Sequence, residues 1–417
     1  MRKFLVPVAL SLIVLITIAG IGMGYPSPGL AYPYSEEHKL LSEVWRIVDR
    51  AYVDDTFNNQ NWWYVRQRAL KQALPDREAT YQAIQQMLAS LDDPFTRFLE
   101  PDQYRSLQTT TSGELTGIGL QITQNADTGL LQVIAPVEGS PAEQAGILPN
   151  DQIVQIDGEL TTDLSLDEAA ERMRGPIGTK VILKIQREAL SPEELDLELV
   201  RDRITLNPVY SALQPQEDGL NIGYIRLSQF NANATAELVE AVNQLEAAGA
   251  TAYILDLRNN PGGLLQAGIE IARLWLDQGT IVYTVNRYGI QDSFDATHRA
   301  ITDAPLAILV NRGTASASEI LSGALQDNGR AKLVGERTFG KGLIQSLFNL
   351  PDGSGLAVTV AKYETPDHRD INKQGIVPDV TVPAELLRRD QLATPADRQF
   401  QAAVDLLQET VVLAGAA

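Results

Sequence analysis

Residues 204–382 alternate between short apolar runs and longer amphipathic runs, and this alternation constrains the fold more than any other feature of the sequence. The apolar runs predict strands at residues 222–227, 252–257, 281–285, 306–310 and 331–334. The amphipathic runs predict helices at residues 237–248, 264–276 and 316–326. Strands that alternate with helices form a largely parallel sheet with helices packed on it. We therefore predict an α/β core over residues 203–390.

The rest of the chain divides into stretches with different patterns. Residues 32–108 repeat apolar side chains at helical spacing, which predicts a small helical module. Residues 109–202 contain short strand-like runs and two short helical patterns, which predict a compact mixed α/β domain. Near the end, Thr394 and Pro395 suit the cap and first position of a helix within residues 391–417. A chain of 417 residues is long enough for such a multidomain α/β protein.

The N-terminus has the pattern of an export signal. Arg2 and Lys3 precede an uncharged, mostly apolar stretch over residues 4–24, and small residues follow at Gly29 and Ala31. We predict a signal peptide over residues 1–31, and hence an exported protein. A retained membrane anchor is the alternative, because about 20 apolar residues also span a bilayer. An anchor would associate the protein with a membrane.

Composition excludes several classes of function. Asp and Glu outnumber Lys and Arg by 53 to 34, so a net charge of −19 makes nucleic acid a poor partner. The sequence has no cysteine, which removes thiol nucleophiles, disulfides and thiolate metal sites. Its three histidines, His38, His298 and His368, lie in polar stretches without a catalytic signature. We expect neither a metal nor a cofactor.

Residues 311–319 hold the densest chemistry of the chain. An apolar strand ends there, a glycine turn follows, and a helix begins at Ser316. A serine at that position lies at the positive end of the helix dipole, among backbone N–H groups that can hold an oxyanion. Ser316 and Glu319 also have the spacing of a capping box, so a purely structural helix start is the alternative.

A serine nucleophile requires a base, and the candidate is Lys341, which lies between Gly340 and Gly342. To act near neutral pH its pKa must fall from about 10.4 to about 7.5, roughly 4 kcal/mol, which burial can supply. The alternatives are an exposed lysine in a turn and a phosphate-binding loop. The phosphate loop is disfavoured because Gly342 replaces the required Ser or Thr, and residues 343–350 alternate like a strand.

A second glycine-rich turn, at residues 256–263, also joins a buried strand to a helix. The N–H of Gly262 or Gly263, with that of Ala317, could form a two-donor oxyanion hole. Viewed alone, this turn could equally serve only as a connection.

Three separated motifs carry a resemblance to a known family: G-T-A-S-A-S-E at 313–319, G-K-G-x-x-Q at 340–345 and L-R-N-N-P-G-G at 257–263. The chain resembles the C-terminal processing peptidases, also called tail-specific proteases. The resemblance implies a serine endopeptidase core of stacked ββα units, like those of crotonases and Clp proteases. The implied catalytic residues are Ser316, Lys341 and Gln345, with Gly262 and Ala317 as oxyanion donors and Asp327 as a possible accessory residue.

The domain at residues 109–202 looks like a PDZ domain. The stretch Gly117, Ile118, Gly119, Leu120 takes the place of the carboxylate-binding loop. PDZ domains add a peptide as an extra strand and hold its terminal carboxylate with backbone N–H groups. Asn150 departs from the usual glycine, but asparagine tolerates left-handed geometry, so we expect the turn to survive.

The resemblance implies a protein substrate with a free C-terminus. The sequence is most similar to the members from cyanobacteria and chloroplasts, which trim the photosystem II reaction-centre precursor in the thylakoid lumen. The periplasm is the other expected compartment. The alternatives are general degradation of exported proteins, a non-catalytic protein that binds C-termini, and an acyl-transfer enzyme with a similar oxyanion hole.

Overall fold

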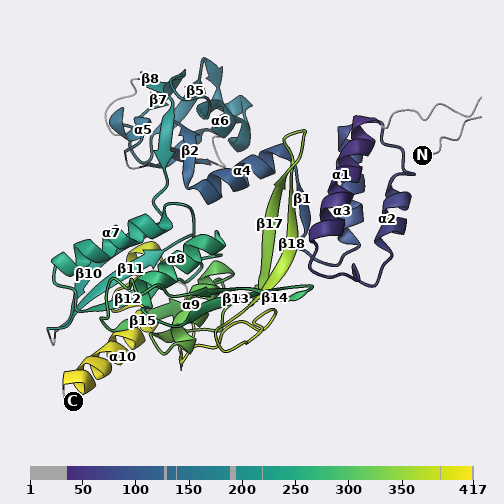
Figure 1. Cartoon of the computed structure of the whole chain (residues 1–417). Helices are drawn as coiled ribbons and strands as arrows, with labels where there is room; N and C mark the ends of the chain where they lie inside the picture. The colour runs from purple at the N-terminus through teal and green to yellow at the C-terminus, as the bar shows by residue number, and fades with distance from the viewer. Residues whose placement is uncertain are drawn as a thin grey trace, which may run out of the picture.

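The computed structural model describes residues 35–125, 129–137, 139–187, 194–217, 219–385 and 387–415. The expected signal peptide or anchor lies outside these residues. Figure 1 shows three groups of elements: helices after the N-terminus, a small domain with its own sheet, and a larger α/β core that ends in the C-terminal helix. Within the described part of the chain, no helix is long and apolar enough to cross a membrane.

The core contains a six-stranded sheet with the order β10-β11-β12-β15-β16-β19. Its strands are β10 (Val209–Pro215), β11 (Asn221–Leu227), β12 (Ala252–Asp256), β15 (Leu306–Val310), β16 (Lys332–Gly335) and β19 (Val380–Thr381). Only β10 runs antiparallel to its neighbour. The largely parallel sheet predicted from the alternation of the sequence is confirmed.

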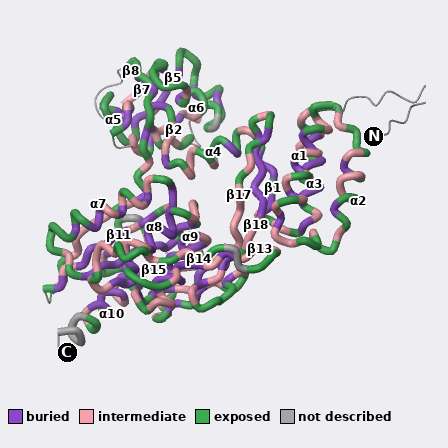
Figure 2. Tube along the Cα trace, viewed as in Figure 1, coloured by how far each residue is buried: buried purple, intermediate pink, exposed green. Residues whose placement is uncertain are grey.

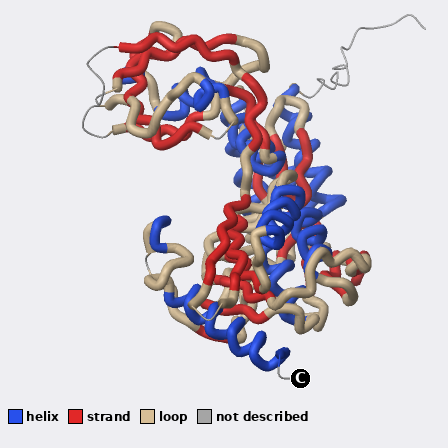
Figure 3. Tube along the Cα trace, turned by 90° about the vertical axis from the view of Figure 1, so that its left-hand side faces the viewer, coloured by secondary structure: helices blue, strands red, loops and turns tan. Residues whose placement is uncertain are grey.

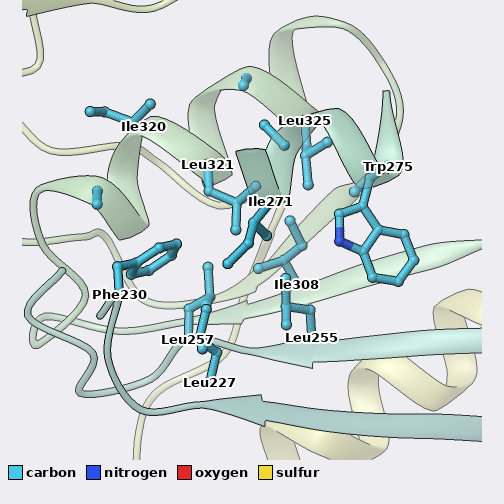
Figure 4. Close-up of a cluster of buried hydrophobic side chains, with 14 of the residues drawn as sticks. Leu227, Phe230, Leu255, Leu257, Ile271, Trp275, Ile308, Ile320, Leu321 and Leu325 are labelled. Atoms are coloured by element: carbon cyan, nitrogen blue, oxygen red, sulfur yellow. The ribbon is translucent and has the colours of Figure 1, made fainter. Parts of the chain in front are cut away.

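Helices cover both faces of this sheet. Helices α7 (Ala234–Ala247), α8 (Leu265–Trp275) and α9 (Ala317–Asp327) pack on one face, where Leu255 and Ile308 meet Leu321 and Trp275 (Figure 4). Alternate strand residues such as Ile254 face α10 (Arg398–Gly415) on the other side. In Figure 2 the buried segments of the core, in purple, gather around α8, α9 and the strands of this sheet. Strands buried on both faces explain the continuous apolar runs in the sequence.

A second sheet lies across the helices from the first. It has the order β1-β18-β13-β14, and β17 pairs with β18. Its strands are β1 (Arg97–Leu99), β13 (Thr280–Asn286), β14 (Gly289–Asp295), β17 (Leu343–Asn349) and β18 (Gly355–Glu364). The predicted strand at 281–285 therefore exists, but it pairs antiparallel in this second sheet. The strand predicted after Lys341 is β17.

The N-terminal helices share their core with this second sheet. Helices α1 (Glu36–Ala51), α2 (Trp62–Ala69) and α3 (Arg77–Ala89) pack on one another, and α4 (Pro101–Ser112) leads to the next domain. Their buried cluster also includes Leu356 and Val358 from β18 and Leu350 from the turn before it, and Phe348 of β17 packs against this cluster. The helical module thus lies directly on the strands that follow Lys341, as Figure 1 shows.

The small domain contains the sheet β3-β4-β5-β7-β8, with β6 paired to β5. Its strands are β3 (Leu120–Gln124), β4 (Leu131–Pro136), β5 (Gln152–Ile156), β6 (Glu159–Leu160), β7 (Lys180–Gln186) and β8 (Glu194–Val200), and its helices are α5 (Pro141–Gln144) and α6 (Leu166–Met173). Asn150 has φ of 72°, so the left-handed turn expected there is confirmed.

Two connections join the small domain to the core. They pair with each other as β2 (Glu114–Gly117) and β9 (Asp202–Thr205). The side view in Figure 3 shows the small domain at the end of this narrow connection, away from the C-terminus. The exact boundaries 32–108, 109–202 and 203–390 stay a prediction. The N-terminal helices share one buried cluster with strands of the core, so the first range is not a separate unit of packing.

The C-terminal helix begins later than the sequence predicts. Thr394 and Pro395 precede it, and α10 starts at Arg398. Asp397 accepts a hydrogen bond from the N–H of Phe400 at 3.1 Å, which is the geometry of a cap. The prediction that placed the cap at Thr394 is therefore wrong, because the Asp397 carboxylate satisfies the first turn instead.

Candidate active site

Ser316 stands in a strained turn at the start of α9. Its backbone has φ of 57° and ψ of −119°, a region that a non-glycine residue rarely adopts. Tyr363 donates a hydrogen bond from its hydroxyl to the Ser316 carbonyl at 3.2 Å. Backbone strain of this kind costs on the order of 1–3 kcal/mol and is typical of functional positions.

Hydrogen bonds join the Ser316 turn to the glycine-rich turn that follows β12. Asn259 donates from its backbone N–H to the Asn311 side chain at 2.9 Å, and the Asn311 amide donates back to the Asn259 side chain at 3.0 Å. Ala315 donates to the carbonyl of Asn260 at 3.0 Å. The two turns that the sequence singled out separately therefore form one rigid structure.

Glycine at position 262 is required by this close approach. Gly262 has φ of 94°, and a Cβ there would lie 2.8 Å from both the Ala317 nitrogen and the Ser316 Cβ. The structure therefore brings Gly262, Ser316 and Ala317 together, as the oxyanion-hole hypothesis requires. Within the described residues, the N–H of Ala317 donates to no protein acceptor. The N–H of Gly262 donates to the Asn260 side chain at 2.9 Å, so only one of the two expected donors is available in this conformation.

One buried carboxylate joins the proposed nucleophile to the proposed base. Oε2 of Glu319 accepts hydrogen bonds from the backbone N–H of Ser316 at 3.0 Å and of Lys341 at 2.8 Å. Oε1 accepts from the Thr338 hydroxyl at 2.5 Å and the Gly340 N–H at 2.7 Å. Burial raises the pKa of Glu319, and these four donated hydrogen bonds oppose the rise. The capping-box reading of Ser316 and Glu319 is thus correct in part, but the same carboxylate also positions Lys341.

The Lys341 side chain is half-buried, and a lysine base requires such a position, from which water is partly excluded. Burial is the main cause that lowers its pKa, the Arg97 guanidinium lowers it further, and Asp93 and Glu319 oppose the shift. Its Nζ lies over the ring of Phe95, 5.0 Å from the centroid. No hydrogen bond joins the Lys341 amine to the Ser316 hydroxyl in the described structure. The backbones of the two residues are held together through Glu319, but their side chains do not interact.

Gln345 lies on β17, two residues into the strand. The ladder between β17 and β18 shifts register between Ile344 and Gln345. The Gln345 amide lies 3.5 Å from the Thr359 hydroxyl, at the limit of a hydrogen bond, and no hydrogen bond joins it to Lys341 in the described structure. Its role as a helper of the base stays a prediction.

Asp327 lies at the opposite end of α9 from Ser316. Its carboxylate pairs with Arg369 and accepts a hydrogen bond from the N–H of Asp367 at 3.1 Å. The helix α9, of 11 residues, ends at Asp327 and begins directly after Ser316. The structure therefore shows Asp327 anchoring the loop after β18, and it does not bring Asp327 to the site.

The predicted carboxylate-binding loop lies at the free edge of the small domain's sheet, because β3 is the terminal strand. The carbonyls of Ile118 and Gly119 accept hydrogen bonds from Ala142 and Val137, whereas the N–H groups of Ile118 and Gly119 donate to no acceptor among the described residues. A groove of about 130 Å³ follows the loop, lined by Gly117, Leu120, Ile122, Ala170 and Met173 among others. The groove and its free donors suit an added peptide strand.

Each of the three histidines lies beside a polar side chain outside the candidate site. His298 lies beside Asp277, His368 beside Glu364, and His38 beside Ser35. Among the described residues, no group of His, Asp and Glu could hold a metal ion.

Sequence reasoning missed the positioning function of Glu319 and the contact of Phe95 with Lys341. Glu319 stood inside a motif that was quoted, but its spacing indicated only a helix cap. Phe95 lies in the turn between α3 and β1, and no sequence pattern links it to residue 341.

Comparisons with known proteins agree with this geometry. The profile of peptidase family S41 matches residues 221–382, which hold both glycine-rich turns, Ser316 and Lys341, and the profile of the PDZ domain matches residues 132–187. The fold and the site define a serine-type peptidase with a PDZ domain.

Individual relatives indicate a narrower group of peptidases. The chain is 60% identical over 385 residues to a carboxyl-terminal-processing protease of Synechocystis sp., covering 92% of this chain and 90% of that protein. It is 49% identical to the chloroplastic carboxyl-terminal-processing peptidase 2 of Arabidopsis thaliana, covering 86% and 70%. The chain belongs to the carboxyl-terminal-processing proteases of peptidase family S41.

A solved structure extends the comparison. The photosystem II D1 C-terminal processing protease is 42% identical and matches with a TM-score of 0.58, covering 88% of this chain and 100% of that one. A putative S41 protease from Bacteroides fragilis matches with a TM-score of 0.53 at 16% identity, which supports the fold alone.

Proposed function

We propose that this protease cleaves near the C-terminus of exported proteins through a Ser316–Lys341 dyad. Lys341 accepts the proton of the Ser316 hydroxyl as the oxygen attacks the scissile carbonyl, and the N–H of Ala317 stabilises the oxyanion. Lys341 then returns the proton to the leaving amine, and water hydrolyses the acyl-enzyme. The observation that carries the proposal is the shared Glu319 carboxylate, which fixes Ser316 and Lys341 side by side.

Two changes complete the site for reaction. The Lys341 amine moves from the Phe95 ring to the Ser316 hydroxyl, and the Gly262 N–H turns from Asn260 toward the substrate oxygen. Both are local, because the backbones of the two residues already adjoin Ser316. Substrate binding would supply the energy for them.

The PDZ groove is proposed to select the substrate by its C-terminus. The unpaired N–H groups of Ile118 and Gly119 would bind the terminal carboxylate, and the apolar side chains of Ala170 and Met173 would contact an apolar residue. A cleft of about 1040 Å³ lies between this domain and the core, and Val137, Asn259 and Asn311 all line it. It offers a path from the groove to the two turns beside Ser316.

The expected compartment is the thylakoid lumen or the periplasm, and the expected substrate is the photosystem II reaction-centre precursor. Relatives named as chloroplastic, and the match to a D1 C-terminal processing protease, support both. Residues 1–31 have the composition of an export signal.

The test is cleavage of a peptide that carries the precursor's C-terminal extension by the wild type, Ser316→Ala and Lys341→Ala. We expect both variants to lose activity, by about 10⁴-fold or more. Equal cleavage by either variant would contradict the dyad. A single released fragment supports processing, whereas a ladder of fragments supports general degradation. Amidation of the peptide's C-terminus should raise KM if the PDZ groove holds the carboxylate.

A further inference from the structure

The base rests against a residue from a distant part of the chain. Nζ of Lys341 lies 5.0 Å from the centroid of the Phe95 ring. Phe95 belongs to the turn between α3 and β1, in the N-terminal helical module, and both side chains are half-buried. The surroundings of Lys341 are therefore formed by two separate parts of the molecule.

Hydrogen bonds fix Phe95 in this position. Oδ1 of Asp93 accepts from the Phe95 N–H at 2.9 Å, and Oδ2 accepts from the hydroxyls of Thr96 and Thr359 at 2.7 Å each. Thr359 lies on β18, directly opposite Gln345 of β17. Because β1 also pairs with β18, the ring is held by the same sheet that positions the residues after Lys341.

The charged groups around Lys341 come from three elements. Arg97 of β1 disfavours the ammonium, whereas Asp93 of the turn and Glu319 of α9 favour it. Tyr363 of β18 stays neutral, because burial raises its pKa well above the usual value. Both carboxylates already accept hydrogen bonds from hydroxyl or N–H groups. Exclusion of water is therefore the main factor that favours the neutral amine.

We propose that Phe95 is a positioning residue of the peptidase: in the resting enzyme its ring seats the Lys341 side chain and excludes water from the amine until the amine moves to Ser316. The proposal rests on the proposed role of Lys341 as the base. The helical module then forms part of the active site. The ring has two opposing effects, because its π face attracts the ammonium, whereas lost hydration disfavours it. Loss of hydration is the larger effect.

These opposing effects allow a sharp test. The pH dependence of Lys341 acetylation by acetic anhydride, followed by peptide mass spectrometry in the full chain, reports the pKa of this amine. The midpoint of the curve is compared, because the absolute rate also depends on access of the reagent. Phe95→Ala admits water, so we expect the midpoint to rise by about one pH unit. Phe95→Leu keeps an apolar cover but removes the π face, so its midpoint should stay at or below the wild-type value.

Three further variants act as controls. Phe98 is buried in the same segment and packs on Tyr81 with centroids 4.7 Å apart, so Phe98→Leu disturbs the module without touching Lys341 and should leave the midpoint unchanged. Arg97→Gln removes a like charge and should raise the midpoint by less than Phe95→Ala, because Arg97 is exposed. Arg97→Lys keeps the charge and should match the wild type.

The outcomes separate the inference from the proposed function. Acetylation is measured in the Ser316→Ala background, so it requires no peptidase activity. A wild-type midpoint in Phe95→Ala, or an equal rise in Phe95→Leu, would overturn the role of Phe95. If Phe95→Ala does not fold, the midpoints of Phe95→Leu and Arg97→Gln are compared instead. A midpoint that is higher in Phe95→Leu than in Arg97→Gln would overturn the role of Phe95.

In the active enzyme, the acid limb of the pH profile of kcat/KM should move with the Lys341 midpoint. Unchanged cleavage by Lys341→Ala would instead refute the dyad.

Discussion

Asp256 and Glu319 are both fully buried in the α/β core, yet different groups hold their charges. Asp256 bonds to the Arg258 guanidinium at 2.7 Å and to Arg226 at 3.3 Å, and Arg258 also bonds Asp397 at the start of α10. Glu319 accepts hydrogen bonds only from hydroxyl and backbone N–H groups in the described structure, and no Lys or Arg side chain pairs with it.

The different partners of the two carboxylates indicate different roles, one in the stability of the fold and the other in the proposed reaction. Burial disfavours the charged form of Asp256, but Arg258 and Arg226 outweigh it, so the pKa of Asp256 lies below its usual value. The charge of Asp256 is therefore balanced by arginines, and Arg258 connects it to Asp397 at the start of α10. Burial raises the pKa of Glu319 instead, and within the described residues no cationic side chain pairs with this carboxylate between Ser316 and Lys341. The first carboxylate stabilises the core, and the second holds the two residues that are proposed to react.

The largest effect is expected on stability from Arg258→Met, which removes the cation from Asp256 and Asp397. A buried ion pair that loses one partner costs about 3–5 kcal/mol, so guanidinium unfolding should show a loss of that size near neutral pH. Because the pKa of Asp256 is lowered in the fold, its stabilisation exists above the unfolded pKa and is lost as pH falls through the folded value. The difference from wild type should therefore shrink in acid.

The matched control is Arg105→Met, which removes an exposed pair with Glu171. Such surface pairs contribute about 0–1 kcal/mol. Equal losses from Arg105→Met and Arg258→Met would show that the buried network around Asp256 has no special weight.

The next largest effect is expected on catalysis from Glu319→Gln. The amide has one acceptor oxygen instead of two, so its N–H₂ group must face the donors of either Ser316 and Lys341 or Thr338 and Gly340. We expect kcat to fall by about 10²-fold, because small displacements of reacting groups cost that much. Steady-state kinetics measure it. Ser322→Ala, one turn further along α9, is the control and should stay near the wild-type rate.

Local sequence patterns predicted most of the fold, and they singled out the two turns that the structure brings together at the candidate site. Strand and helix periods between residues 204 and 382 are local properties, and Ser316, Gly262 and Ala317 each follow the end of a buried strand. Contacts such as that of Phe95 with Lys341 join residues far apart in the chain, and no period or spacing encodes them. The start of α10 was misjudged for a similar reason, because its cap, Asp397, is held by Arg258 from β12's following turn.

A smaller effect is expected from Lys341→Met, which should stabilise the fold by roughly 1 kcal/mol while abolishing activity. Burial lowers the pKa of Lys341 from its ordinary value of 10.5, so the unfolded chain binds more protons than the folded one. The cost of the buried lysine is therefore fully present below its folded pKa and disappears as pH rises past 10.5. Thermal unfolding at pH 7 and pH 10 measures it. A variant less stable than wild type at pH 7 would contradict this account.

The smallest effect is expected from the strained backbone of Ser316. Ser316→Ala and Ser316→Gly both remove the proposed nucleophile, but only glycine adopts φ of 57° and ψ of −119° without strain. Ser316→Gly should therefore be more stable than Ser316→Ala by about 1 kcal/mol, after the extra entropy of unfolded glycine is offset. Chemical denaturation of the two inactive proteins measures the difference without interference from self-cleavage. Equal stability would mean that the turn relaxes, and that Asn259, Asn311 and Glu319 do not hold it as rigidly as their hydrogen bonds indicate.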